Sequence, residues 1–220
     1  MGKNYEYSCQ CSSQIKSSTS SSTFSMKKND TCPSYSIQIY DPETGNLASY
    51  ENWTVKVNMY YVSYLKTDIQ DDTMTISLLG NLNLDQIKVG DIIKPTSLDQ
   101  SVDEEMLITA MDVNNKTITV TRGYDSTTAT SFKKKSKLIF YRIFEKDGYV
   151  DSEYEEDEND ELSDDEELDY SLIKYDWNPE DTTHAGIYCL EFKISQVVDS
   201  TTKTRSFPSS SNEEYTVHIL

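Results

Sequence analysis

Residues 170–220 read YSLIKYDWNPEDTTHAGIYCLEFKISQVVDSTTKTRSFPSSSNEEYTVHIL, and this stretch decides the fold. Its first part alternates strictly between two kinds of side chain. Ile173, Tyr175 and Trp177 occupy every second position, between Leu172, Lys174 and Asp176. Alternation with a period of two is typical of a strand that buries one face and exposes the other.

Turn signals divide the rest of this stretch into further strands. Pro179 fixes its own φ and disfavours helix at the preceding residue, so the first strand must stop there. The segment Asp181-Thr182-Thr183 can hydrogen-bond to its own backbone and turn the chain. A second strand follows, with either Tyr188, Leu190 and Phe192 or Ile187, Cys189 and Ile194 facing a core, and Tyr215-Thr216-Val217-His218-Ile219 forms the last strand. An Asp-rich turn before Gly-x-Tyr and an apolar strand is typical of immunoglobulin-like sandwiches.

The same residues resemble the closing half of the small sandwich at the N-terminus of phage upper baseplate proteins. The resemblance covers about fifty residues and is carried by Tyr175, Trp177, Asp181-Thr182, Gly186-x-Tyr188, Glu191-Phe192, Phe207-Pro208 and Val217-x-Ile219. Val197-Val198-Asp199-Ser200 stands where the family commonly has a glycine-containing segment. The alternative is any other immunoglobulin-like domain, because this fold hosts many functions.

Two strands upstream are expected to open this sandwich. The segment 36–40 alternates and runs into the turn 41–45, which has Pro and Gly where a reverse turn favours them. The second strand has Trp53, Val55, Val57 and Met59 on one face. Together these segments predict a sandwich formed by residues 35–70 and 142–220.

A second β-rich module, residues 71–141, is expected to interrupt the sandwich. Its predicted strands are 73–78, 105–111, 117–121 and 137–141, and residues 89–93 are expected to turn into a further strand. The segments 105–111 and 117–121 form a hairpin. The module resembles one that recurs in phage tail and baseplate proteins. The resemblance is carried by Gly90-Asp91-x-Ile93, Glu105-Met106-Leu107-Ile108, Ile118-x-Val120-Thr121-Arg122-Gly123 and Thr127-Thr128-Ala129, whereas Ser131-Phe132-Lys133-Lys134 stands where the family commonly has His and Gly.

Residues 1–34 are polar and include the low-complexity run SSTSSSTFS. Such a segment buries too little apolar surface to offset the entropy of ordering it. Two interpretations are open: a disordered tail, or an N-terminal arm that becomes ordered on a neighbouring subunit with Tyr5, Tyr7 and Phe24 as anchors.

The net charge of −18 is unevenly distributed. Residues 151–169 contain thirteen Asp or Glu and no Lys or Arg, so the remaining residues carry −5. A solvated, self-repelling acidic loop is the favoured interpretation. Calcium binding is one alternative, but the Asp-x-Asp-x-Asp-Gly spacing of a calcium loop is absent. DNA mimicry is the other, but the charge lies in one loop instead of along a face. The basic cluster 133–137 is too small to indicate a nucleic-acid surface.

The cysteines and histidines give little indication of a metal site or of a catalytic site. Cys9, Cys11 and Cys32 offer three thiolates to zinc, but at an unusual spacing and without an identified fourth ligand. Cys189 is expected to be a small core residue. His184 falls in a turn and His218 near the end of a strand, and no phosphate-binding loop, zinc-protease motif or nucleophile elbow is present. We therefore predict no enzymatic activity, and no catalytic, cofactor-binding or metal-ligating residue.

No apolar run is long enough to span a membrane, and MGKNYEYSCQCSSQ lacks the apolar core of a signal peptide. The overall prediction is an all-β chain, with an immunoglobulin-like sandwich interrupted by a small β module and preceded by an extended arm. The resemblances imply a non-enzymatic structural component of a tailed-phage particle. Such a component would be assembled in the host cytoplasm and would dock as an adaptor or decoration protein to other virion proteins of the baseplate, tail, fibre or capsid, without binding nucleic acid. The alternative is a carbohydrate-binding adhesin module, in which exposed Tyr and Trp side chains stack on sugar rings.

Overall fold

The computed structural model describes residues 22–31, 34–38, 49–79, 86–96, 104–151, 171–207 and 215–220. Within these ranges the chain forms twelve strands, the short 3-10 helix η2 (Tyr124–Ser126) and no α-helix. The predicted all-β class is therefore confirmed. The strands are β1 (Ser22–Met26), β2 (Tyr35–Gln38), β3 (Thr54–Tyr64), β4 (Thr75–Ser77), β5 (Ile92–Thr96), β6 (Met106–Asp112), β7 (Thr117–Thr121), β8 (Lys137–Asp151), β9 (Leu172–Tyr175), β10 (Gly186–Val198), β11 (Thr201–Phe207) and β12 (Tyr215–Ile219).

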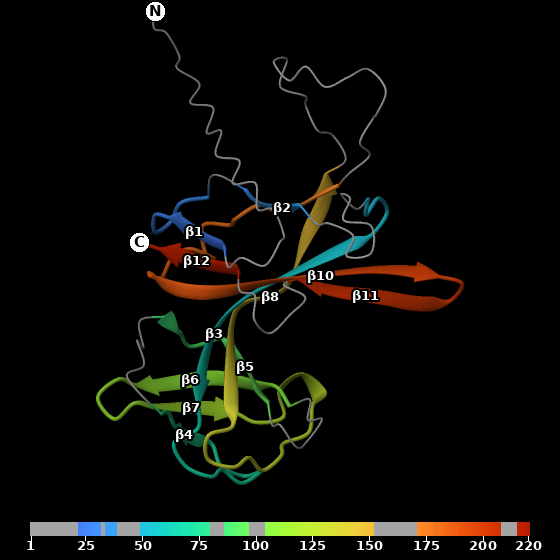
Figure 1. Cartoon of the computed structure of the whole chain (residues 1–220). Helices are drawn as coiled ribbons and strands as arrows, with labels where there is room; N and C mark the ends of the chain where they lie inside the picture. Colours follow the sequence, from blue (N-terminus) through green and yellow to red (C-terminus); the bar gives the residue numbers. More distant parts are fainter. Residues whose placement is uncertain are drawn as a thin grey trace, which may run out of the picture.

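The strands form one continuous hydrogen-bonded system with the order β1-β12-β10-β3-β8-β5-β6-β7-β4. Three strands lie off this path: β11 pairs with β10, β9 pairs with β8, and β2 pairs with β9. All pairs are antiparallel except β1 with β12, which is parallel. The hairpin of β10 and β11 extends away from the rest of the molecule (Figure 1).

The buried apolar side chains form two separate clusters. The first, here called the terminal core, contains Phe24, Met26, Tyr35, Ile37, Tyr50, Val55, Val57, Met59, Ile143, Ile173, Tyr175, Trp177, Tyr188, Leu190, Phe192, Ile194, Tyr215, Val217 and Ile219. The second, here called the central core, contains Leu65, Ile69, Ile76, Leu78, Ile87, Ile93, Met106, Ile108, Ile118, Val120, Phe132, Leu138 and Phe140. Residues 65–140 thus bury their own apolar surface, and both ends of the described chain bury theirs together.

In the terminal core, β2 and β9 pack across from β1 and β10. The ring of Tyr35 in β2 stacks on Phe192 in β10 with centroids 5.7 Å apart, and it meets Phe24 of β1 edge-on at 5.4 Å. Stacked aromatic pairs across two layers contribute more than their buried area alone. The terminal core is therefore filled mainly by aromatic rings from opposing strands.

The alternation in 170–220 predicts the buried faces correctly. Ile173 and Tyr175 of β9 are buried, as is Trp177 beyond its end. Of the two candidate faces of β10, the structure buries the one with Tyr188, Leu190 and Phe192, and Ile187 is 55% exposed. Ile194, which was expected on the face of Ile187, is buried with Tyr188 and its neighbours, because it lies an even number of positions from them along the strand. Cys189 lies on the opposite face and is half-buried, so its expected place in the core is wrong.

The N-terminal segment departs from expectation at Ser22. Residues Ser22–Met26 form β1, which pairs in register with β12 from Ser22 opposite Tyr215 to Met26 opposite Ile219. Phe24, expected to anchor an arm on a neighbouring subunit, is instead buried in the core of its own chain. The expected arm 1–34 is therefore wrong over 22–31. Tyr5, Tyr7, Cys9, Cys11 and Cys32 lie outside the described residues.

Two long strands run through both cores. β8 contributes Leu138 and Phe140 to the central core and Ile143 to the terminal core, so the expected module boundary after Tyr141 falls inside a continuous strand. β3 runs beside it, with Tyr60 opposite Tyr141. Figure 1 shows β3 and β8 passing together from one half of the molecule to the other.

A β-bulge interrupts the pairing of β8 with β3 just after Ile143. Its register with β3 shifts beside Asn58, and Glu145 adopts a positive φ of 49°. The buried Asn58 side chain accepts a hydrogen bond from the Glu145 N–H at 2.8 Å and donates one to Glu191 at 3.0 Å. Bulges sharpen the local twist and redirect side chains, and they are frequent beside functional sites.

Candidate functional site

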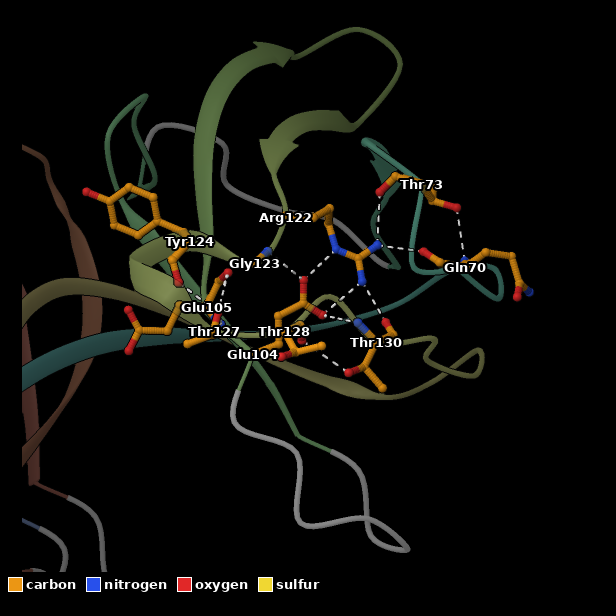
Figure 2. A network of polar contacts seen from close by, with 10 residues as sticks. All are labelled: Gln70, Thr73, Glu104, Glu105, Arg122, Gly123, Tyr124, Thr127, Thr128 and Thr130. Carbon is orange, nitrogen blue, oxygen red and sulfur yellow. Dashed lines mark hydrogen bonds and ion pairs between the residues drawn. The ribbon is translucent and has the colours of Figure 1, made fainter.

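The most connected polar group in the described chain is the ion pair of Glu104 and Arg122 (Figure 2). Arg122 Nε donates to Glu104 Oε1 at 2.7 Å, and Nη2 donates to Oε2 at 2.9 Å, which makes the pair bidentate. The two side chains are 5% and 0% exposed. We call this group, with the backbone atoms that it contacts, the clasp.

Every hydrogen-bond donor of Arg122 in the clasp has an acceptor. Nη1 donates to the carbonyl oxygens of Gln70 at 2.6 Å and Thr73 at 3.0 Å, and Nη2 also donates to the carbonyl oxygen of Thr130 at 2.6 Å. With the two bonds to Glu104, this accounts for all five N–H groups of a guanidinium. Arg122 therefore has no donor left for a ligand.

Glu104 is equally well satisfied. Oε1 also accepts from the N–H of Gly123 at 3.2 Å, and Oε2 accepts from the N–H of Thr130 at 2.9 Å. One buried carboxylate thus holds two loop segments beside the guanidinium, as Figure 2 shows. A buried pair is stable only when additional hydrogen bonds satisfy both ions, and the clasp meets this condition.

The turn after Arg122 explains why these residue types follow it. Gly123 has φ 59°, and a Cβ added to it would lie 2.9 Å from the carbonyl oxygen of Thr127, so the position favours glycine. The Thr127 hydroxyl donates to the Tyr124 carbonyl at 2.7 Å and accepts from the Glu105 N–H at 3.0 Å. The motif Arg122-Gly123 with Thr127-Thr128 therefore closes a loop over the central core.

A second polar group, around Arg142, lies where the two cores meet. Arg142 Nη2 donates to Thr183 Oγ1 and to His184 Nδ1, both at 2.5 Å, and Nη1 lies 3.5 Å from Asp91 Oδ1. Burial raises the pKa of Asp91, while the Lys88 N–H bond and the Arg142 charge act in the opposite direction. This group joins the start of β5 to the turn that precedes β10.

The turn itself is held by Asp181, which is nearly fully buried. Its carboxylate accepts from the hydroxyl of Tyr175 at 2.8 Å, from the N–H of Asn178 at 2.8 Å and from Lys146 at 2.8 Å. The pKa of Tyr175 is raised by burial first and by this bond second. The predicted Asp-rich turn therefore carries a buried hydrogen-bonded carboxylate.

The remaining residues singled out from the sequence do not form a site. His184 lies in the turn and His218 in β12, as predicted. Lys133 pairs with Asp68 at the surface at 3.2 Å. Residues 152–169 of the acidic run lie outside the described residues. Across the described ranges, no group of three or more His, Cys, Asp or Glu side chains could hold a metal ion.

The chain contains three arginines, Arg122, Arg142 and Arg205. Arg122 and Arg142 form the two polar groups described above, and Arg205 donates to the hydroxyl of Tyr50 at 3.2 Å. Arginine suits fixed, multiply hydrogen-bonded positions better than lysine does. Because arginine is rare in this chain, each arginine could have been singled out from the sequence as the centre of a polar group. The module-type motif includes Glu105, however, and not Glu104, which is the actual partner of Arg122.

Comparison with protein-family models and with curated proteins yields no match to this chain. In the part of the chain that the structure describes, no helix is long and apolar enough to cross a membrane.

Proposed function

We propose that this protein is a non-enzymatic structural component of a tailed-phage particle, an adaptor or decoration protein that docks to other virion proteins. One observation carries the proposal. The two segments with phage-type sequence resemblance lie in two different cores, and these cores are joined by the unbroken strands β3 and β8. Two cores joined by two strands suit a component that holds neighbours at a fixed spacing.

The terminal core supports an immunoglobulin-like sandwich within this proposal. Tyr188 lies in β10 just after the turn, with its ring buried and its hydroxyl 3.4 Å from the carbonyl of His184, four residues upstream. A tyrosine whose hydroxyl bonds to backbone a few residues upstream is a hallmark of immunoglobulin-like corners.

The central core supports the inserted module. Residues 65–140 enclose their own apolar cluster, and the clasp fastens four of their segments. The module-type motif supplies Arg122 and Gly123 to that clasp, and neither Arg122 nor Glu104 keeps a free hydrogen-bonding group for substrate. The motif residues thus have a structural role, which favours a binding protein over an enzyme.

The hairpin of β10 and β11 is the surface we propose for docking to another virion protein. In the described chain β11 pairs on one side only, with β10, and Val197 near the tip is 70% exposed. An unpaired strand edge offers backbone groups to a strand of a partner. We retain the N-terminal arm, now limited to residues 1–21, as a second contact to a neighbouring subunit.

Complementation with graded amounts of protein tests the structural role. Particles are assembled in cells that carry the phage with this gene disrupted, while the chain is supplied from an inducible copy. A structural component must be present in stoichiometric amounts, so we expect the yield of infectious particles to rise in proportion to the chain supplied. A full yield of particles when far fewer copies of the chain than particles are supplied would indicate a catalytic role and contradict the proposal.

The alternative is a carbohydrate-binding adhesin module. Among the described residues, three exposed tyrosines favour it: Tyr64, Tyr124 and Tyr149. The tryptophans favour it less than the tyrosines do, since Trp177 is buried and Trp53 packs half-buried against the terminal core. A glycan array separates the two candidates, because selective binding that is lost in a Tyr64→Ala or Tyr149→Ala variant would favour the adhesin.

A further inference from the structure

A cluster of exposed lysines lies at the start of β8. The segment 133–137 has four lysines in five positions and is the densest basic segment of the chain. The N–H of Lys135 donates to the carbonyl oxygen of Leu65 at 2.9 Å, which places Lys66 next to this segment. We call the exposed side chains here the basic patch, and they are Lys66, Lys133, Lys134, Lys135 and Lys137.

The positive charge of the basic patch is poorly neutralised. Among the described residues, Asp68 is the only carboxylate that pairs with it. Asp68 accepts from the N–H of Lys134 at 2.7 Å and from Lys133 Nζ at 3.2 Å, and the other four lysines have no carboxylate partner within the described ranges. Like charges gathered on one surface attract a partner of opposite charge.

The acidic run begins at the other end of the same strand. β8 starts at Lys137, opposite Thr96 of β5, and ends at Asp151, opposite Leu172 of β9. Residues 151–169 contain thirteen Asp or Glu and no Lys or Arg. Because β8 passes from one half of the molecule to the other (Figure 1), its start carries the basic patch and its end carries the acidic run.

The acidic run is badly placed to cover the basic patch of its own copy. β8 has 15 residues, and at about 3.3 Å per residue it extends over roughly 45 Å, less what the bulge takes. Residues 152–170 are tied at both ends, to Asp151 and Ser171, so their midpoint reaches at most about 33 Å from these anchors. Covering its own patch would demand a nearly fully extended loop, whereas the patch of a second copy can approach the run directly.

The net charge of −18 does not prevent this approach. In about 0.15 M salt the Debye length is about 8 Å, so exposed charges that lie much further apart are largely screened from one another. Two copies that meet patch to run bring opposite charges together, while their two acidic runs stay roughly the length of β8 apart. The charges at the contact therefore decide whether the copies attract.

We infer that the chain associates head to tail with further copies of itself, with the acidic run of one copy bound to the basic patch of the next. The contact joins two different surfaces, so it repeats from copy to copy and gives a closed ring or an open filament. The inference goes beyond the particle role proposed above, because it concerns the purified chain and leaves the hairpin of β10 and β11 to a different partner.

Sedimentation velocity on the full chain at increasing concentration tests the head-to-tail contact. In about 0.15 M salt we expect the sedimentation coefficient to rise with concentration beyond the value for a dimer. In about 1 M salt, where the Debye length falls to about 3 Å, it should stay at the monomer value. Lys133→Gln, Lys134→Gln and Lys135→Gln together should weaken association about tenfold, which is the loss expected for three exposed ion pairs.

A matched control removes the same charge elsewhere. Lys27→Gln, Lys28→Gln and Lys203→Gln together give the same net charge at exposed positions outside the basic patch and should leave the association unchanged. Both triple variants should melt like the parent chain, because every lysine replaced is exposed.

Mixing two variants tests the direction of the contact. The triple variant at 133–135 keeps its acidic run. A second variant, with every Asp→Asn and Glu→Gln in residues 153–169, keeps its basic patch. At concentrations where neither variant associates alone, an equimolar mixture should form dimers and no larger species, because the mixture has one intact contact.

Three results would overturn the head-to-tail contact. The first is a monomer at every concentration in about 0.15 M salt. The second is an association that the two triple variants weaken equally. The third is a mixture of the two variants that contains no dimer. A complex with short duplex DNA that requires the three lysines, formed by a chain that does not self-associate, would assign the basic patch to nucleic acid instead.

Discussion

The hydroxyl of Tyr188 in the terminal core lies 3.1 Å from the main-chain carbonyl oxygen of Gln86, which directly precedes Ile87 of the central core. This buried hydrogen bond joins the two cores through residues that belong to neither β3 nor β8. Tyr188→Phe should lower the free energy of unfolding by about 1 kcal/mol, because the carbonyl loses its partner. Tyr188→Ala should cost about 3–5 kcal/mol through the lost core volume. Urea unfolding measures both values.

The decrease in the free energy of unfolding at alkaline pH provides a second test of the position of Tyr188. Burial raises the pKa of Tyr188 to about 12, from an ordinary value of 10.0. The folded state therefore favours the neutral phenol, and its contribution to stability is complete below pH 10 and is lost as the pH rises towards 12. Tyr188→Phe should lose less stability over this interval than the parent chain. The exposed Tyr64→Phe is the control, and equal alkaline limbs for both variants would contradict the buried position of Tyr188.

Mutations in the clasp should destabilise the protein more than mutations in any other described polar group of the central core. Removal of one partner from a buried ion pair leaves an uncompensated charge and typically costs about 3–5 kcal/mol. We expect losses of this size for Glu104→Gln and for Arg122→Lys, since one ammonium group cannot replace the five donors that serve Glu104, Gln70, Thr73 and Thr130. Urea unfolding tests both variants. Lys133→Gln, which breaks an exposed pair, should cause no measurable change, and a similarly small effect of Glu104→Gln would show that the clasp is not needed.

The terminal core should fold without the central core. Tyr60 and Tyr141 are cross-strand partners, so replacing residues 61–140 by Asn-Gly joins β3 to β8 through a two-residue hairpin turn. The product should unfold cooperatively and keep its near-UV circular dichroism. It should melt at a lower temperature than the full chain, because the bond from Tyr188 to Gln86 is lost.

Removal of residues 71–141 is the matched control for this excision. It truncates β8 at Arg142 and leaves Leu65 and Ile69 without the rest of the central core. This product should be less stable than the one that joins Tyr60 to Tyr141. A loss of near-UV signal in both products would show that the two cores fold only together.

The first strand supplies a further prediction. Deletion of residues 1–21 removes none of the described contacts and should leave the melting temperature nearly unchanged. Phe24→Ala should cost about 3–5 kcal/mol, because the ring is buried against Tyr35 and Trp177. Thr23→Ala on the exposed face is the control. Hydrogen exchange should show protected amides in Ser22–Met26, and rapid exchange there would contradict the pairing of β1 with β12.

The sequence predicts those elements whose buried face alternates regularly. In β9, β10 and β12 the apolar side chains recur at every second position, and the structure buries those positions. β1 has only Phe24 and Met26 in a run of Ser and Thr, and its partner strand lies more than 180 residues away along the chain. Local pattern alone could not reveal such a strand, because its stability comes from the distant partner.

The length of β8 and the clasp could not be predicted from the sequence for similar reasons. Residues Glu145, Lys146, Asp147 and Gly148 are typical of a loop, yet they continue the strand. Gly148 is required because an added Cβ would lie 2.7 Å from the Lys174 carbonyl oxygen. In the clasp, Glu104 reaches Arg122 across 18 positions, and its role depends on backbone carbonyls that no residue pattern encodes.

Mass spectrometry of purified particles tests the structural role most directly. Gradient-purified particles of the phage that carries this gene are separated into heads and tails, and the chain is quantified in each fraction with isotope-labelled peptides. The proposed role predicts a constant number of copies per particle, concentrated in one sub-assembly and resistant to high-salt washing. Absence of the chain from intact particles, or its removal by the wash, would contradict a structural role in the virion.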